Sequence, residues 1–227
     1  MLISIITLFP EMFDGVFSHS ILKRGQEKGA LTIQLINHRD FGIGKHKIVD
    51  DKPYGGGIGM LLRVDVLAQA IASARKFKTG EKVILLDPKG TRYTQEVAEN
   101  LSKLKHIILV CGHYEGFDER INDFVDMKIS LGDFVLSGGE IPAMAITESI
   151  GRLTKGVLAK ENATVLESFS KTNEKRILEH PHYTRPQDYK GKTVPKILLS
   201  GDQKKIDEYR TNEAQRATRR QRPDLLK

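Results

Sequence analysis

The glycine-rich segment 130–142, SLGDFVLSGGEIP, constrains the fold more than any other part of the chain. It carries few charges and follows a short apolar run of the kind that forms a buried strand. Two comparable segments come earlier, LLDPKG at 85–90 and CGHYEGFDER at 111–120, and each also follows an apolar run. Because glycine has no Cβ, the backbone can approach a ligand closely at such places. We therefore predict that three loops build one pocket.

Short apolar runs alternate with helical patterns over the first 154 residues. Strands are predicted at 2–8, 31–36, 83–86, 106–110 and 127–130, and helices at 11–17, 20–28, 63–76, 94–104, 117–125 and 141–154. A long loop is expected at 37–59. This alternation favours an open parallel α/β sheet. In such a sheet ligands bind at the carboxyl ends of the strands, where the glycine-rich segments fall.

The composition changes near Gly156, and the rest of the chain is predicted to form a small second unit. Within it, 201–222 is expected to be one long helix that begins after an Asp202 cap. The helix carries many lysines and arginines and looks too polar for a core element. Either a phosphate backbone or solvent is therefore expected to face it.

The formal net charge of +7 favours a polyanionic partner, most often nucleic acid. Cys111 is the only cysteine, so no internal disulfide can form, which suits the reducing cytoplasm. It ends the apolar run HIILVC and is predicted to be a buried small residue, not a nucleophile. No apolar run approaches the roughly 18 residues needed to cross a membrane.

The predicted pocket suits a nucleoside more than a phosphate. The chain has no G-x-G-x-x-G after its first strand and no P-loop. Leu86, Leu131, Phe134 and Leu136 can hold a flat ring, with Glu115 nearby, so S-adenosylmethionine is a reasonable ligand. His180 and His182 do not have a standard zinc spacing, and no metal ligands are predicted.

Several segments together resemble the bacterial tRNA (guanine-N(1))-methyltransferases, the TrmD family, over essentially the whole chain. They are LFPEMF, DDKPYGGGIGM, LVCGHYEGFDERI, SLGDFVLSGGEIPAM, GVL, ESF, HPHYTRP and QRPDLL. The combination of SLGDFVLSGGEIPAM with GHYEGFDER is highly specific for this family. The resemblance implies methyl transfer from S-adenosyl-L-methionine to N1 of guanine at position 37 of tRNA, next to the anticodon.

The resemblance also implies a SPOUT fold, an α/β fold whose parallel sheet carries a deep trefoil knot toward its C-terminal side. It implies a methyltransferase domain at 1–158, an interdomain linker at 159–174 and a small, mainly helical tRNA-binding domain at 175–227. The family forms homodimers whose active sites are shared between subunits. By motif position, the cofactor contacts are expected to be Leu86, Asp87, Pro88, Gly112, Tyr114, Glu115, Gly116, Ser130, Leu131, Gly132, Phe134, Leu136, Gly138, Gly139 and Pro142.

The position of the family's catalytic arginine falls on Arg152, and that of its catalytic acid falls on Glu167, before a Ser-Phe pair. The family usually has aspartate there, tyrosine at Phe134 and proline at Ile58. Candidate RNA contacts are Gly59, Arg185, Arg216, Arg219 and Arg220. Family members use Mg²⁺, for which the sequence shows no ligand set.

Two other functions remain compatible with these residues. One is an RNA-binding protein that keeps the cofactor pocket without turnover, which the Glu167 departure would support. The other is an enzyme that acts on another nucleobase or on a small molecule, against which the basic helix at 201–222 speaks.

Overall fold

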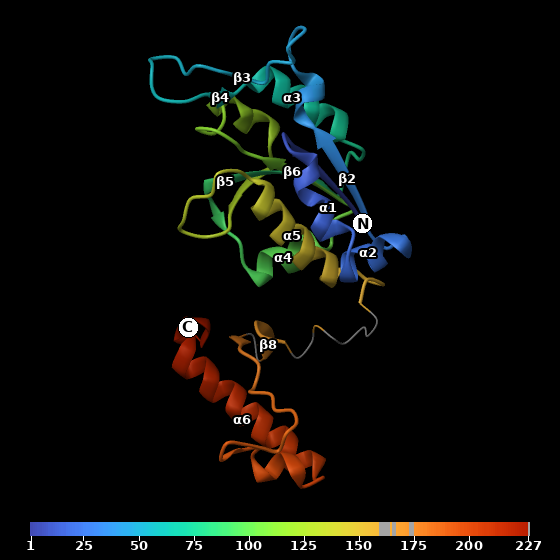
Figure 1. The fold of residues 1–227 in the computed structure, drawn as a ribbon, viewed down its shortest axis with the longest axis vertical. Helices are drawn as coiled ribbons and strands as arrows, with labels where there is room; N and C mark the ends of the chain where they lie inside the picture. Colours follow the sequence, from blue (N-terminus) through green and yellow to red (C-terminus); the bar gives the residue numbers. More distant parts are fainter. Residues whose placement is uncertain (159–163, 165–166, 173–174, 227) are drawn as a thin grey trace. The chain divides into compact units, whose positions relative to one another are not determined.

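The computed structural model describes residues 1–158, 164, 167–172 and 175–226. The chain divides into two compact units, Met1–Ala159 and Lys160–Lys227, and each is described by itself (Figure 1). Within the described residues no helix is both long enough and apolar enough to span a membrane.

The first unit is built on a five-stranded parallel sheet with the order β2-β1-β6-β5-β7. The strands are β1 (Leu2–Thr7), β2 (Thr32–Asn37), β5 (Glu81–Arg92), β6 (His106–Cys111) and β7 (Met127–Ser130). Most of their apolar residues are buried, as β-branched and aliphatic runs require in a sheet covered on both faces. The predicted parallel α/β sheet is confirmed.

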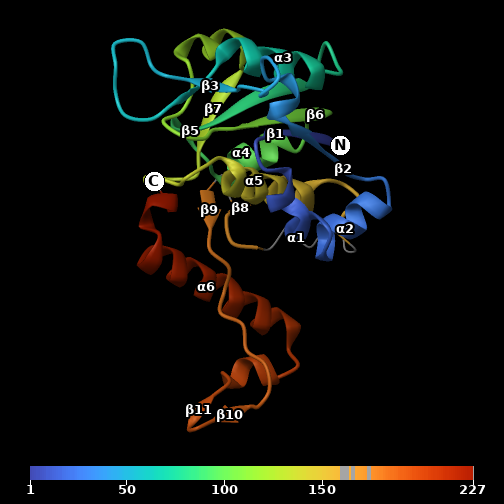
Figure 2. The ribbon, with the colours of Figure 1, turned by 45° about the horizontal axis from the view of Figure 1, so that its top comes forward.

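Helices cover both faces of this sheet (Figure 2). On one face lie α1 (Asp14–Phe17), α2 (Ser20–Glu27), α4 (Gln95–Leu101) and α5 (Glu140–Leu153), and on the other lies α3 (Val64–Ala74). Alternate strand residues serve the two layers, because successive side chains of a strand point to opposite faces. Ile5 packs with the α5 layer, for example, and Ile6 with the α3 layer.

Several predicted boundaries differ from the structure. The segment 85–90 is not a free loop, because β5 continues to Arg92 after a register shift between Leu86 and Thr91. Gly90 packs so closely on β7 that a Cβ would lie 2.5 Å from the Ile129 nitrogen. The predicted helix at 117–125 is a 3-10 helix, η3 (Glu119–Phe124), and η1 (Pro10–Phe13) precedes α1.

The predicted loop at 37–59 contains regular structure. It holds a 3-10 helix, η2 (His38–Phe41), and an Ile43–Ile48 bridge. Strand β3 (Asp50–Asp51) then pairs antiparallel with β4 (Leu61–Leu62), so the segment between them is a hairpin loop.

Buried polar side chains join three strands at their amino ends. Ser4 Oγ lies 2.9 Å from His106 Nε2, and His106 Nδ1 lies 2.7 Å from Glu81 Oε2. Burial raises the pKa of Glu81, but the backbone N–H groups of Lys76 and Phe77 and the His106 imidazole outweigh it, so the pKa is lowered. The three side chains are almost fully buried, so we assign them a structural role.

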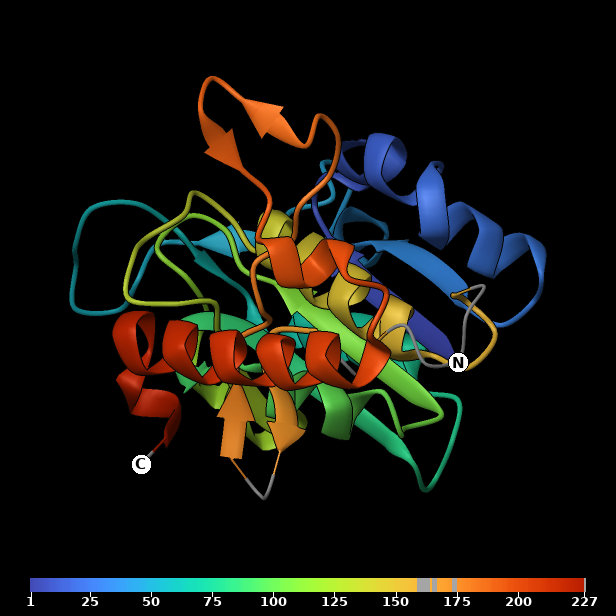
Figure 3. The ribbon, with the colours of Figure 1, turned by 90° about the horizontal axis from the view of Figure 1, so that it is seen from below.

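The second unit contains α6 (Gln203–Gln221), two antiparallel strand pairs and the 3-10 helices η4 (Lys196–Leu199) and η5 (Pro223–Leu226) (Figure 3). The pairs are β8 (Ser170–Thr172) with β9 (Lys175–Ile177), and β10 (Asp188–Tyr189) with β11 (Lys192–Thr193). Much of the linker expected at 159–174 lies outside the described residues.

The long helix starts as predicted, with Asp202 accepting a hydrogen bond from the Lys205 backbone nitrogen at 3.2 Å. It was expected to be too polar for the core, and this is wrong on one face. Ile206, Ala214 and Thr218 are buried there, and Thr218 Oγ1 accepts a hydrogen bond from the Leu178 nitrogen.

Candidate functional site

A cavity of about 390 Å³ lies at the carboxyl ends of β6 and β7 and beside the part of β5 where the register shifts. It is large enough for a nucleoside-sized ligand, since ligand pockets range over about 300–1,000 Å³. The three glycine-bearing segments form its walls, so the structure brings all the predicted cofactor contacts together. These are Leu86, Asp87, Pro88, Gly112, Tyr114, Glu115, Gly116, Ser130, Leu131, Gly132, Phe134, Leu136, Gly138, Gly139 and Pro142.

The turn after β6 has an unusual backbone. Tyr114 has a φ of +57° and Gly116 a φ of +108°, and the Gly116 nitrogen donates to the His113 oxygen at 3.1 Å. A side-chain-bearing residue in the left-handed region costs of order 1–3 kcal/mol and persists where the surroundings impose it. Such strain is common at ligand-binding sites and supports a functional role for this turn.

The segment 137–139 crosses the end of β6 in direct backbone contact. The Gly139 nitrogen donates to the Gly112 oxygen at 2.8 Å. A Cβ on Gly139 would lie 2.6 Å from Cys111 Cα and 2.7 Å from the Gly112 nitrogen. A side chain does not fit between these two backbones, so the crossing requires glycine.

Glu140 holds the start of α5 beside this crossing. Its carboxylate is 2% exposed and accepts a hydrogen bond from Thr7 Oγ1 at 2.8 Å, and Thr7 Oγ1 accepts one from the Phe9 nitrogen at 3.0 Å. Glu140 Oε2 also occupies the space next to Gly138, where a Cβ would lie 2.3 Å from it. Sequence reasoning did not single out Glu140 or Thr7, which are far apart in the chain.

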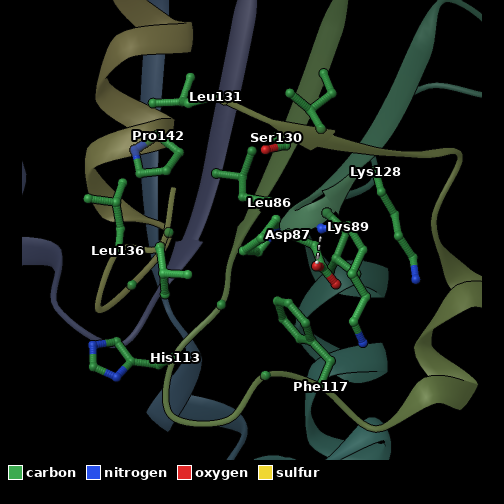
Figure 4. Close-up of a pocket in the computed structure, with 18 of the residues that line it drawn as sticks. Leu86, Asp87, Lys89, His113, Phe117, Lys128, Ser130, Leu131, Leu136 and Pro142 are labelled. Atoms are coloured by element: carbon green, nitrogen blue, oxygen red, sulfur yellow. Dashed lines mark hydrogen bonds between the residues drawn. The ribbon is translucent and has the colours of Figure 1, made fainter. Parts of the chain in front are cut away.

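The two ends of the cavity differ in chemistry (Figure 4). Leu86, Leu131, Leu136 and Pro142 give one end an apolar wall suited to a flat ring. Asp87, Lys89 and Lys128 lie at the other end with Phe117, and the Lys89 nitrogen donates to Asp87 Oδ1 at 2.8 Å. Lys89, His113 and Phe117 stand within the glycine-bearing segments, which could have revealed them. Nothing in the sequence points to Lys128.

Comparison with known proteins shows the family of this chain. The family model described as tRNA (Guanine-1)-methyltransferase TrmD matches residues 1–227. The chain belongs to the TrmD family. It is similar to the tRNA (guanine-N(1)-)-methyltransferase of Anoxybacillus flavithermus, with 52% identity over 228 residues, all of this chain and 91% of the relative. Its identity to the Bacillus subtilis protein of the same name is 51% over 229 residues, all of this chain and 93% of the relative.

Cys111 is buried at the end of β6 beside the TrmD-family pocket. Burial, and after it the charge of Glu140, raise the pKa of the Cys111 thiol well above its ordinary value. The predicted burial of Cys111 is confirmed, and a thiol with a raised pKa is a weaker nucleophile because less of it is present as thiolate.

The residues that the TrmD resemblance marked as catalytic lie in different units. Arg152 is in the last turn of α5 in the first unit, and Glu167 is in a turn before β8 in the second. Gly59 has a φ of +85° and lies against Glu115, since a Cβ would come 2.4 Å from Glu115 Cγ.

The remaining predicted RNA contacts lie in the second unit. Arg185 is exposed in an irregular segment. Arg216, Arg219 and Arg220 line a hollow on α6 together with Asn212 and Gln215, and Arg216 also pairs with Glu213 at 2.8 Å. This hollow offers guanidinium and amide groups, the side chains that commonly contact phosphate and sugar oxygens.

Proposed function

We propose that the protein transfers the methyl group of S-adenosyl-L-methionine to N1 of guanine 37 in tRNA, next to the anticodon. The observation that carries this proposal is the convergence of the three glycine-bearing segments on one cavity in a chain of the TrmD family. The relatives' names describe transfer to guanine N1, and the pocket suits a nucleoside cofactor.

The pocket residues fit S-adenosyl-L-methionine. Leu86, Leu131 and Leu136 would hold the adenine ring, and Gly139 lets the segment 137–139, which lines the cavity, pack directly on the end of β6. Glu115 and Asp87 would face its ammonium group. The bound cofactor supplies an electrophilic methyl group on a sulfonium, whose departure leaves a neutral thioether.

The chain's own residues carry the proton chemistry. Guanine N1 bears a proton at neutral pH and must lose it to become a nucleophile. Glu167 is the general base that takes this proton, a role worth roughly 100- to 10,000-fold in rate. Negative charge then develops toward the purine oxygen, and the guanidinium of Arg152 stabilises it.

We infer that the first unit is a SPOUT domain with a trefoil knot. Support comes from the path of the chain after β7, which lies next to β5 at the edge of the sheet. From there the chain crosses the end of β6 at Gly139, and α5 then packs against β1 and β6. A crossing of this kind brings 130–153 past the turn 112–116.

Exposed apolar side chains support a homodimer with shared active sites. Phe134, Val135 and Ile141 are exposed on the segment that crosses the sheet and on the start of α5, where a second copy would cover them. The second unit would then bring its arginines to the tRNA. The single, protonated cysteine and the tRNA substrate fit an enzyme of the cytoplasm.

The roles proposed for Glu167 and Arg152 do not depend on a metal ion. Among residues 1–158, 164, 167–172 and 175–226, no group of three or more His, Cys, Asp or Glu side chains is placed to hold one. Mg²⁺ is usually held by one or two carboxylates together with substrate oxygens and water, so tRNA would have to supply part of any Mg²⁺ site.

A transfer assay tests the function directly. The protein is incubated with labelled cofactor and two tRNA transcripts that differ only in having guanine or adenine at position 37. Label should enter the guanine transcript alone, and nuclease mapping should place it at position 37. Retention of tRNA without transfer would instead indicate a binding protein, and equal labelling of both transcripts would indicate another target nucleotide.

A further inference from the structure

The hairpin loop between β3 and β4 stands out from the first unit (Figures 1 and 2). Its base is fixed by the pairs Asp50–Leu62 and Asp51–Leu61. At its tip, Tyr54 is 100% exposed and Ile58 is 94% exposed. When several large apolar side chains of one short segment are fully exposed, they commonly mark a binding surface.

The hairpin is joined to the pocket wall by three backbone hydrogen bonds. The Glu115 nitrogen donates to the Met60 oxygen at 3.1 Å, the Leu62 nitrogen to the Gly116 oxygen at 2.9 Å, and the Asp118 nitrogen to the Leu62 oxygen at 3.1 Å. Leu61, the first residue of β4, lines the cavity itself. When one part of a substrate enters the pocket, the adjoining parts of the same substrate therefore lie beside the hairpin.

Glycines surround the exposed tyrosine and leave its ring accessible. Gly55, Gly56, Gly57 and Gly59 all have φ values between +81° and +138°, so the tip adopts a backbone that residues with side chains avoid. Apart from the adjoining residues in the chain, no described atom lies within 4 Å of the Cβ position at Gly55 or Gly56. The faces of the ring can therefore accept a planar partner.

The nearby charges favour RNA as that partner. Lys52 precedes the tip and is exposed, and Arg120, whose guanidinium is also exposed, comes two residues after Asp118, which is hydrogen-bonded to β4. A second protein copy is a weaker candidate, because an aromatic side chain buries only about 150–250 Å² and a stable interface needs about 800 Å² per partner. Single-stranded RNA is commonly held by stacking of its bases on aromatic side chains.

We propose that Tyr54 stacks on the nucleobase that flanks the target guanine, with Ile58 packing against the same nucleotide. This inference rests on the proposed function and adds a positioning residue to it. The stacked neighbour fixes the loop while the target base enters the pocket. Tyr54 thus contributes to tRNA binding and orientation without contacting the cofactor.

The test measures binding of an anticodon stem-loop RNA by fluorescence anisotropy, and single-turnover methylation, in the full-length protein. Tyr54→Ala should weaken RNA binding about 5- to 150-fold, the usual worth of one base–aromatic stack. Tyr54→Phe keeps the ring and should stay within about twofold of the parent. Phe124→Ala, which removes another exposed aromatic ring of the first unit, is the matched control and should have no effect.

Two further RNAs, abasic at the nucleotide before or after the target, identify the stacked base. For one of these RNAs, Tyr54→Ala should not weaken binding, because the base that stacks on Tyr54 is already missing. Equal loss on the intact and both abasic RNAs, or no loss at all, would overturn the proposal. So would a changed sedimentation coefficient with unchanged RNA binding, which would assign Tyr54 to a contact between copies. If the parent binds RNA without methylating it, the proposed function fails while the binding ratios still decide the role of Tyr54.

Discussion

Replacing Gly139 by alanine tests the crossing that forms the pocket. The added Cβ would lie 2.6 Å from Cys111 Cα and 2.7 Å from the Gly112 nitrogen, whereas non-bonded carbon atoms prefer about 3.5–4.0 Å. The overlap is therefore about 1 Å, and both neighbours are backbone atoms that cannot rotate away. Gly139 has a φ of −82°, which alanine adopts freely, so the effect is steric and not conformational.

The magnitude follows from this overlap. Overpacking of a dense site costs typically about 1–3 kcal/mol, which corresponds to a fall in Tm of roughly 2–12 °C for a chain of this size. A shift of the pocket wall by about 1 Å can also lower the transfer rate about 100-fold. We expect Gly139→Ala to lower Tm in thermal melting and to lower the rate of single-turnover methylation. Calorimetry should also show weaker binding of S-adenosyl-L-methionine.

Two glycines provide matched controls. A Cβ on Gly151 in α5 would lie 2.6 Å from Leu22 Cδ2, the flexible end of a side chain of α2, so Gly151→Ala should lower Tm without changing cofactor affinity. No described atom lies within 4 Å of the Cβ position of Gly15, and Gly15→Ala should be neutral or slightly stabilising. The reasoning is refuted if Gly139→Ala melts like Gly151→Ala yet binds cofactor and transfers methyl like the parent.

The other predictions concern the base, the RNA and pH. Glu167→Gln should lower single-turnover transfer by roughly 100- to 10,000-fold with little change in cofactor affinity. Glu167→Asp should stay active. If the rate of Glu167→Gln is within a few-fold of the parent rate, the general base is another group. Neutralising Arg216, Arg219 and Arg220 together should weaken tRNA binding and reduce its salt slope by about one unit per lost phosphate contact, and an unchanged slope would leave α6 as a solvated surface. Because the pKa of Glu81 is lowered in the folded protein, its charged carboxylate stabilises the fold fully above about pH 4.5. This contribution is lost as pH falls through the lowered pKa. Between pH 6 and 3, Tm should therefore fall less for Glu81→Gln than for the parent protein. An equal fall in Tm for both would contradict this.

Local patterns were enough to predict most of the secondary structure. Strand β7 (Met127–Ser130) has the predicted bounds, and α5 and α6 start within two residues of theirs, because apolar periodicity and capping depend on neighbouring residues. The pocket residues could also be predicted, since glycine-bearing segments after buried strands converge at one edge of a parallel sheet. The family resemblance then supplied the individual residues.

Tertiary structure alone decided the rest. The continuation of β5 through 85–90 depends on pairing with β7, and the polar end of the cavity depends on Lys128, which no local pattern marks. The hydrogen bond from Thr7 to Glu140 joins residues 133 positions apart. A sequence pattern reports the few residues on either side of it, whereas contacts of this kind exist only once distant segments are packed together, so the amino acids at 7, 128 and 140 acquire their roles from the fold.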